Sequence, residues 1–269
     1  MIRLIASDID GTLVKDGSDG INPEIFTVIE KLKEKGIYFV AASGRQYPSL
    51  ANLFAPVHDK IFFVSENGSH ICTSKQKLFS FPMKIEYVRE IVREVRMLQD
   101  CEILLGTADF EYVESKDASF IDLLINGYHN TIKEVPNLLE VDDAIIKVSI
   151  YHKENAFEVA GHLIDEWSNR LKVAVAGNCW IDFMSEGVSK GAAIQIIQES
   201  LGIGQGETMA FGDQQNDVEM LQQAAYSYAV ENAKPEAKRA AKYVCGKNTE
   251  DGVLQVLKQL LQELENEEK

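Results

Sequence analysis

Two aspartates separated by one isoleucine are the first residues whose types and spacing could do chemistry. The segment "IASDIDGTLV" places Asp8 and Asp10 directly after an apolar run that begins at Ile2. Two carboxylates this close repel each other, so a buried strand that ends in them needs a nearby positive charge. Alternate residues of a strand share a face, so we expect Asp8 and Asp10 on one side and Ile9 on the other.

Polar residues also follow three other apolar runs. They are Ser43, Gly44 and Arg45 after "IYFVAA", Glu66, Asn67 and Gly68 after "KIFFVS", and Asp213, Asn216 and Asp217 after "TMAFG". Ligands of open α/β sheets bind at the carboxyl ends of the strands, where such residues would meet. Lys190, at the start of the helical pattern "SKGAAIQII", supplies an ammonium group.

Carboxylates gathered at one sheet edge indicate a hard cation with oxygen ligands, and Mg²⁺ fits best. The candidate metal ligands are Asp8, Asp10, Asp213 and Asp217. Lys190 adds a fixed positive charge, Ser43 offers a hydroxyl, and the backbone N–H groups at Ser43 and Gly44 can hold phosphate oxygens. The set predicts a site for a phosphoryl group.

Each motif also has a simpler explanation when it stands alone. The segment around Asp8 could be a strand before an Asp-Gly turn, or a calcium loop. Asp213 could cap a helix, Lys190 could be a solvated lysine, and Asn67-Gly68 could be a hairpin turn. The motifs fall in order after successive strands, and this combination favours one shared site.

Strand and helix patterns alternate at both ends of the chain, which predicts a Rossmann-like, doubly wound parallel α/β core. A helix is expected in "NPEIFTVIEKLKEKG", capped by Asn22, with Pro23 in its first turn and its end at Gly36. We expect residues 1–82 and 188–269 to form this catalytic core.

The middle of the chain has a different pattern. The segment "KIEYVREIVREVRML" places six apolar residues on one helical face, namely Ile85, Val88, Ile91, Val92, Val95 and Leu98. A second helix is expected through "NAFEVAGHLIDEWSNRL", and Gly177-Asn178 indicates a hairpin between two strands. These elements predict an inserted α+β cap domain at residues 83–187.

Composition excludes several classes of protein. The chain has 269 residues and a net charge of −15, which argues against a nucleic-acid partner. Apolar runs are too short for a membrane span or a signal peptide. The four cysteines show no C-x-x-C spacing and the five histidines no metal spacing, so we expect reduced thiols and a cytoplasmic protein.

The segments "DIDGTLV", "AASGR", "SKGAAI" and "GDQQNDVEML" resemble the four motifs of the haloacid dehalogenase-like hydrolases. They are most similar to the Cof-type branch, whose large α/β cap is inserted between the second and third motifs. The "ENGS", "ENAKPEAKRAAKYV" and "EDGV" segments resemble that branch too. The resemblance covers nearly the whole chain, whereas residues 83–187 match in length and pattern only.

The resemblance implies a role for each motif residue. Asp8 would be the nucleophile and Asp10 the general acid/base. Ser43 and Lys190 would be phosphate ligands, and Asn216 would contact the phosphate or orient the nucleophile. We also expect phosphate or substrate contacts from Ile9, Gly44 and Asn67. Asp213 would bind the metal beside Asp8 and the backbone carbonyl of Asp10, and Asp217 would position Lys190 or a metal-bound water.

We therefore expect a Mg²⁺-dependent phosphatase that acts on a small metabolite, a sugar phosphate or a flavin- or nucleotide-related phosphate, through an aspartyl-phosphate. One alternative is a phosphotransferase or phosphomutase on the same fold. Another is a non-catalytic phosphate or metal sensor, which would not need both Asp8 and Asp10. Asp182, Glu186 and Asn67 are candidate contacts for the sugar or base of the substrate, with a solvated or structural role as the alternative for each. The expected assembly is a monomer or small homo-oligomer without a membrane partner.

Overall fold

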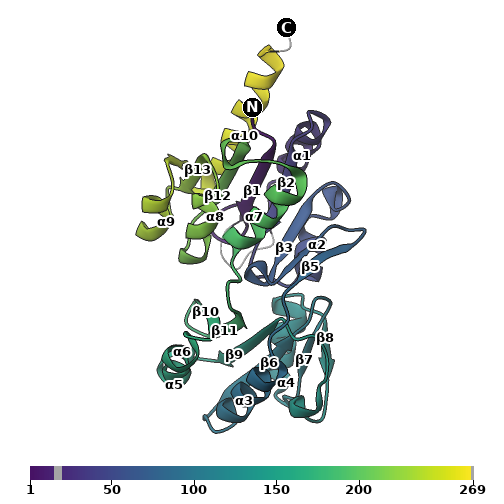
Figure 1. The fold of residues 1–269 in the computed structure, drawn as a ribbon, viewed down its shortest axis with the longest axis vertical. Helices are drawn as coiled ribbons and strands as arrows, with labels where there is room; N and C mark the ends of the chain where they lie inside the picture. Colours follow the sequence, from purple (N-terminus) through teal and green to yellow (C-terminus); the bar gives the residue numbers. More distant parts are fainter. Residues whose placement is uncertain (15–19, 268–269) are drawn as a thin grey trace. The chain divides into compact units, whose positions relative to one another are not determined.

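The computed structural model describes residues 1–14 and 20–267 and forms two compact units (Figure 1). The first unit comprises Met1–Gly44, Leu50–Leu78 and Ser189–Lys269. The second comprises Arg45–Ser49 and Phe79–Val188. The chain thus leaves the first unit and returns to it, as an inserted segment requires.

An eight-stranded sheet in the order β14-β13-β12-β1-β2-β3-β4-β5 forms the centre of the first unit. Its strands are β1 (Leu4–Asp8), β2 (Tyr38–Ala42), β3 (Phe62–Ser65), β4 (His70–Cys72), β5 (Lys77–Ser80), β12 (Thr208–Gly212), β13 (Tyr226–Val230) and β14 (Tyr243–Cys245). Neighbouring strands from β14 to β3 run parallel. The predicted doubly wound parallel sheet is confirmed.

Helices follow the strands of this sheet. They are α1 (Glu24–Glu34), α2 (Tyr47–Leu53), α7 (Lys190–Leu201), α8 (Val218–Gln222), α9 (Pro235–Ala240) and α10 (Gly252–Glu267). Short helical turns are η1 (Ala55–Val57), η2 (Glu66–Gly68), η5 (Gln205–Glu207), η6 (Gln215–Asp217) and η7 (Asn248–Glu250). The α1 helix packs against α10, and α7 packs against α8. Every residue of β1 and β12 is buried, as in a sheet covered on both faces.

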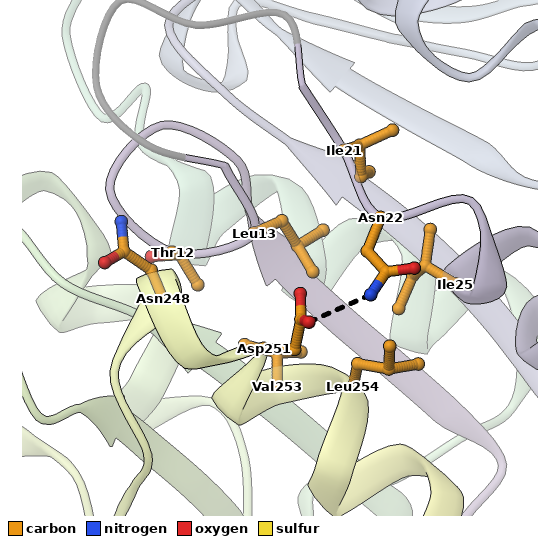
Figure 2. Close-up of a pocket in the computed structure, with 9 residues that line it drawn as sticks. All are labelled: Thr12, Leu13, Ile21, Asn22, Ile25, Asn248, Asp251, Val253 and Leu254. Carbon is orange, nitrogen blue, oxygen red and sulfur yellow. Dashed lines mark hydrogen bonds between the residues drawn. The ribbon is translucent and has the colours of Figure 1, made fainter.

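The predicted first helix is confirmed. Its apolar residues at helical spacing, Ile25, Val28, Ile29 and Leu32, are all buried. Asn22 Oδ1 accepts a hydrogen bond from the backbone N–H of Glu24, and Gly36 follows the helix with a φ of 77°. Asn22 also donates to Asp251 Oδ2 at 2.9 Å, which ties the start of α1 to the start of α10 (Figure 2).

The second unit is built on a six-stranded sheet in the order β10-β11-β9-β6-β7-β8. Its strands are β6 (Cys101–Gly106), β7 (Glu111–Val113), β8 (Ile132–Glu134), β9 (Lys147–His152), β10 (Leu171–Ala176) and β11 (Trp180–Ser185). Its helices and turns are α3 (Ile85–Val95), α4 (Ala118–Asp122), η3 (Leu123–Gly127), η4 (Leu138–Glu140), α5 (Ala156–Ala160) and α6 (His162–Trp167). Most neighbouring strands are antiparallel, and β7–β8 is a parallel pair.

The apolar face of α3 packs into the core of this unit, as its pattern predicts. The hairpin at Gly177 is also confirmed, since Gly177 joins the antiparallel pair β10–β11 with a φ of 59°. The helix expected over residues 155–171 is divided into α5 and α6 at Gly161, and Asn155 caps the first piece. Within the described residues, no helix has the length and apolar character that a membrane crossing requires.

Candidate active site

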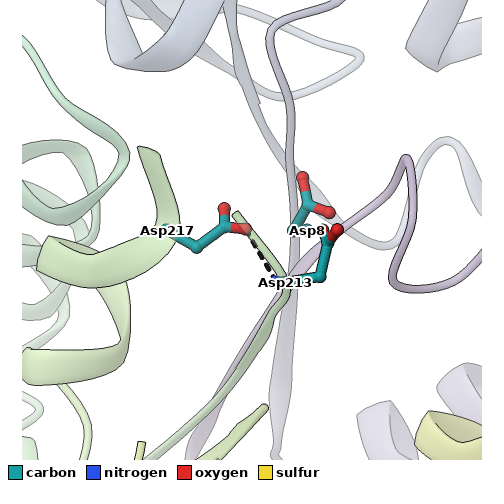
Figure 3. A group of neighbouring side chains, drawn as sticks. All are labelled: Asp8, Asp213 and Asp217. Carbon is teal, nitrogen blue, oxygen red and sulfur yellow. Dashed lines mark hydrogen bonds between the residues drawn. The ribbon is translucent and has the colours of Figure 1, made fainter. Parts of the chain in front are cut away.

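Three buried carboxylates meet at the carboxyl ends of β1 and β12. Asp8 ends β1, Asp213 follows β12 directly, and Asp217 ends the short turn η6. One oxygen from each lies within 4.8 Å of the others, and none of the three residues is more than 4% exposed (Figure 3). The parallel pairing of β1 with β12 brings these residues together from opposite ends of the sequence.

Lys190 lies against this cluster. Its Nζ donates to Asp8 Oδ1 at 2.5 Å and to Asp217 Oδ1 at 2.7 Å. Burial alone would lower the pKa of this ammonium, but the charges of Asp217 and Asp8 outweigh burial and raise its pKa. Ser189 Oγ accepts a hydrogen bond from the backbone N–H of Ala192 and so starts α7 at Lys190. Lys190 is therefore held as a positive charge against Asp8 and Asp217.

One ammonium does not balance three carboxylates. Burial raises the pKa of Asp8 well above its ordinary value, and the charge of Asp217 adds to this effect. Burial and then Asp217 raise the pKa of Asp213 to about 6. Both groups therefore resist ionisation in the absence of a further cation.

Asp217 organises the loop around the cluster. Its Oδ2 accepts hydrogen bonds from the backbone N–H groups of Asp213 and Gln214, both at 2.9 Å, while its Oδ1 receives Lys190. A Cβ on Gly212 would lie 2.5 Å from that of Asp217, so the glycine permits this approach. Both oxygens of Asp217 are engaged within the protein.

Asp10 lies in a tight turn after β1. Ser43 Oγ donates to Asp10 Oδ2 at 3.3 Å, and Asp10 is only half-buried. Gly11 has a φ of 86°, and a Cβ there would lie 2.4 Å from Asp213 Oδ2. Both the positive φ and the close approach to Asp213 require glycine at position 11. The side chain of the neighbouring Ile9 is fully buried. Any contact of Ile9 with a ligand would therefore use its backbone.

The remaining predicted residues form a second part of the same edge. Asn216 Nδ2 donates to Asn67 Oδ1 at 3.0 Å, and the N–H of Asn67 donates to the carbonyl of Ser43 at 3.0 Å. A Cβ on Gly44 would lie 3.2 Å from the Asn67 amide. The structure brings together Ser43, Gly44, Asn67 and Asn216 within the first unit. Asn67 also lies in the loop between antiparallel strands β3 and β4, so the hairpin expectation holds as well.

Asp182 and Glu186, the other candidate contacts, lie in the second unit. Asp182 is buried, accepts a hydrogen bond from Ser149 Oγ at 2.6 Å and pairs with Lys147 at 3.8 Å. Glu186 is exposed. Asp182 therefore has partners within its own unit.

Sequence reasoning gave no role in the cluster to Thr12 or Gln214. Thr12 Oγ1 donates to Asp213 Oδ1 at 3.0 Å, and Gln214 Nε2 donates to Asp213 Oδ2 at 2.9 Å. Both residues lie close to motif aspartates in the sequence, which is the one signal that could have indicated them. The close approach at Gly68 was also missed, since a Cβ there would lie 2.3 Å from the carbonyl oxygen of Ser189 at the start of α7.

The cluster fits a hard cation on its own geometry. Asp8 Oδ2 is buried and has no hydrogen-bond partner within residues 1–14 and 20–267. An unpartnered carboxylate oxygen beside two further acids is unfavourable unless a cation binds it. Carboxylate oxygens are the ligands that Mg²⁺ prefers, so Asp8 and Asp213 could hold it.

Comparison with known proteins agrees with the motifs. A family model described as haloacid dehalogenase-like hydrolase matches residues 5–257. The 5-amino-6-(5-phospho-D-ribitylamino)uracil phosphatase YbjI of Escherichia coli is 30% identical over 261 residues, which is 97% of this chain and 96% of that protein. The phosphatase YitU of Bacillus subtilis, named for the same substrate, is 27% identical. The alignment covers 95% of this chain and 96% of YitU.

A protein from Eubacterium rectale with a crystal structure is 39% identical in sequence, and its structure matches this one with a TM-score of 0.89. The match covers 96% of this chain and 99% of the chain from Eubacterium rectale. The family match spans both the cluster of aspartates and the inserted unit. The resemblance read from the four motifs is confirmed. The chain therefore belongs to the haloacid dehalogenase-like hydrolases, in their Cof-type branch.

Proposed function

We propose that this hydrolase removes the phosphoryl group of small phosphate monoesters through a covalent intermediate on Asp8, with Mg²⁺ as its cofactor. The chain is a phosphoric monoester hydrolase of its family. The observation that carries the residue assignment is the buried cluster of Asp8, Asp213 and Asp217 with one ammonium, in which Asp8 Oδ2 lacks a partner among the described residues.

Asp8 is the proposed nucleophile. One of its oxygens attacks phosphorus, the bond from phosphorus to the ester oxygen breaks, and an aspartyl-phosphate forms. The hydrogen bond from Lys190 favours the ionised form of Asp8, which burial disfavours. Lys190 also places a positive charge where the phosphoryl oxygens arrive.

Asp10 is the proposed general acid/base. It gives its proton to the departing ester oxygen, then takes a proton from a water that attacks phosphorus. The bond from phosphorus to Asp8 breaks, phosphate leaves, and both aspartates return to their starting states. The half-buried position of Asp10 supports this role, because a group that exchanges protons with water must be reachable by water.

Mg²⁺ bound to Asp8, Asp213 and the backbone carbonyl of Asp10 would offset the negative charge of the phosphoryl group. Asp217 supports the site by holding Lys190 and two N–H groups of the Asp213 loop. Ser43, Gly44, Asn67 and Asn216 lie at the same edge of the sheet and would hold the phosphoryl oxygens, together with the backbone of Ile9.

The substrate class proposed is a small phosphorylated metabolite, selected by a cap formed by residues 83–187. The names of YbjI and YitU make 5-amino-6-(5-phospho-D-ribitylamino)uracil the first compound to assay. A cytoplasmic location, in which the four thiols stay reduced, is part of the proposal. A panel of sugar and flavin-related phosphates, with phosphate release as the readout, would rank substrates.

Trapping the intermediate tests the assignment. Asp10→Asn removes the base that activates water, so the phospho-enzyme should accumulate on p-nitrophenyl phosphate, whose leaving group needs little protonation. Mass spectrometry of the quenched protein should place the phosphoryl group on the peptide that contains Asp8. Asp8→Asn should show neither the adduct nor turnover. Substantial turnover by Asp8→Asn would refute the covalent route.

A further inference from the structure

Two asparagines from the last third of the chain hold the turn that carries Asp10. Asn232 Nδ2 donates to the carbonyl of Gly11 at 3.0 Å, across 221 residues of sequence. Asn248 Nδ2 donates to the carbonyl of Val14 at 3.1 Å. The backbone N–H of Asn248 donates to Asn232 Oδ1 at 3.0 Å. The three hydrogen bonds form one continuous chain, which we call the asparagine relay.

The turn itself is closed by short backbone hydrogen bonds. The carbonyl of Ile9 accepts from the N–H groups of Leu13 at 2.9 Å and Val14 at 3.0 Å, and Gly11 donates to the carbonyl of Val14 at 2.9 Å. A closed turn moves as a unit, so a displacement at Gly11 or Val14 also displaces Asp10. The relay binds the carbonyls of those two residues. Asn248 also lies beside Thr12, which belongs to the turn (Figure 2).

The same loop reaches the second half of the cluster. Two residues after Asn232, the backbone N–H of Lys234 donates to the carbonyl of Asp213 at 2.8 Å. The loop after β13 therefore contacts both the Asp10 turn and the Asp213 loop. Asp8 is held separately, by its place at the end of β1 and by Lys190. A change in the relay should thus affect Asp10 more than Asp8.

The relay is partly open to solvent, which limits what it adds to stability. Asn232 is exposed and Asn248 is half-buried. The hydrogen bond between the two asparagines is exposed, and their hydrogen bonds to Gly11 and Val14 are partly buried. Water replaces such bonds in part when they are broken. Their consequence for the fold is small, whereas a displacement of a proton-transfer group by a fraction of an ångström slows the reaction strongly.

We propose that Asn232 and Asn248 are positioning residues that hold Asp10 in line with the ester oxygen. The inference rests on the proposed function, because it requires Asp10 to be the general acid. Its signature is a loss of rate that depends on the leaving group. An ester whose leaving oxygen is basic needs the proton of Asp10, while an ester with a weakly basic leaving group needs it less.

The test compares kcat/KM for phenyl phosphate and for p-nitrophenyl phosphate, since this constant reports the steps up to formation of the phospho-enzyme. The principal variant is Asn232→Asp, which keeps the acceptor for Asn248 but replaces the amide donor with an oxygen that faces the carbonyl of Gly11. We expect a loss of about tenfold on phenyl phosphate and about twofold on p-nitrophenyl phosphate. Asn248→Ala should give the same bias.

Lys258→Ala is the matched control. Lys258 forms an exposed ion pair with Glu24 at 2.7 Å and so also links the C-terminal helix to the N-terminal half of the chain, but this ion pair lies outside the turn. Both esters should be hydrolysed by this variant as by the unaltered protein. Urea unfolding of each variant shows whether the fold is retained. If Asn232→Asp does not fold, the comparison of the two esters is made with Asn248→Ala instead.

Asp10→Asn separates the two possible failures. If Asp10→Asn shows the leaving-group bias and the relay variants lose both activities equally, the relay is only structural and the inference is overturned. If Asp10→Asn shows no bias, Asp10 is not the general acid, and the proposed function falls together with the inference. A bias shared by Asp10→Asn and both relay variants supports the inference.

Discussion

The metal-free protein should become more resistant to alkaline pH when Asp213 is changed to asparagine. Asp213 lies beside Asp8 and Asp217, and among the described residues the Lys190 ammonium bonds to these two carboxylates. Burial, and then the charge of Asp217, raises its pKa from 3.8 to about 6. The Asp213→Asn substitution would keep the size of the side chain and remove the charge. The variant therefore isolates the electrostatic strain of the cluster from its packing.

The size of the effect follows from that pKa. A carboxyl with a raised pKa binds its proton more tightly in the folded state, so its stabilising contribution is present below pH 4 and is lost as the pH rises through 6. Two pKa units at about 1.4 kcal/mol each amount to about 3 kcal/mol in total. Between pH 5 and pH 8 the expected loss is about 1 kcal/mol, because pH 5 lies about one unit below the pKa of folded Asp213 and pH 8 lies above it.

Urea unfolding with a chelator present, at pH 5 and pH 8, measures this loss. The decrease in the free energy of unfolding between the two pH values should be about 1 kcal/mol smaller in Asp213→Asn than in the unaltered protein. Asp59→Asn, which removes an exposed carboxylate from the same unit, should leave the decrease unchanged. Mg²⁺ at 100 times its dissociation constant should then stabilise the unaltered protein by about 2.7 kcal/mol and Asp213→Asn much less.

Two results would refute the reasoning. Equal pH dependence of unaltered protein and variant would mean that Asp213 is not under electrostatic strain. Equal stabilisation of both by Mg²⁺ would mean that the cation binds elsewhere. The measurement does not depend on knowing the substrate.

Three further predictions concern the same site. Chelation should abolish phosphate release and Mg²⁺ should restore it, with Mn²⁺ as a partial substitute; full activity of a metal-stripped sample, checked by elemental analysis, would contradict this. Lys190→Met should lower the rate by at least about a hundredfold and destabilise the metal-free protein by about 3–5 kcal/mol, because it leaves two buried carboxylates without their partner; rate assays and urea unfolding measure the two effects. Gly68→Ala should destabilise the protein by about 1–3 kcal/mol or more, since its φ is 106° and its new Cβ would meet the backbone of Ser189; Gly36→Ala, with a φ of 77° and open space around it, should cost less in the same unfolding assay.

Much of the site could be predicted because its signals are local. Asp8, Ser43 and Asp213 each follow an apolar run that reads as a strand, and parallel strands bring their ends to one edge. The amphipathic pattern of α3 and the start and end signals of α1 are likewise contained in short windows of sequence. Such features need no knowledge of distant contacts.

The rest depends on contacts between distant residues. That Asn232 would reach Gly11, or that Gly68 would face Ser189, follows only from the three-dimensional arrangement. The one-residue interruption between α5 and α6 had no proline to signal it, and Gly161 keeps helical backbone angles and still donates to Phe157. Three residues around the site, Glu66, Asn67 and Gly68, adopt positive φ values. Pattern analysis could mark the Asn67-Gly68 turn but not these angles.

The geometry also bears on how the carboxylates divide their work. Asp217 uses one oxygen for Lys190 and the other for two backbone N–H groups, so both of its oxygens have partners. Asp8 uses one oxygen for Lys190 and leaves the other unpartnered among the described residues. Asp213 accepts one neutral donor at each oxygen, from Thr12 and Gln214, whereas Asp217 accepts the Lys190 ammonium and two backbone N–H groups. A cation would therefore gain most from Asp8 and least from Asp217. We infer that Asp217 positions Lys190 and the Asp213 loop, and that Asp217→Asn should weaken catalysis more than it weakens Mg²⁺ binding, which titration calorimetry can separate.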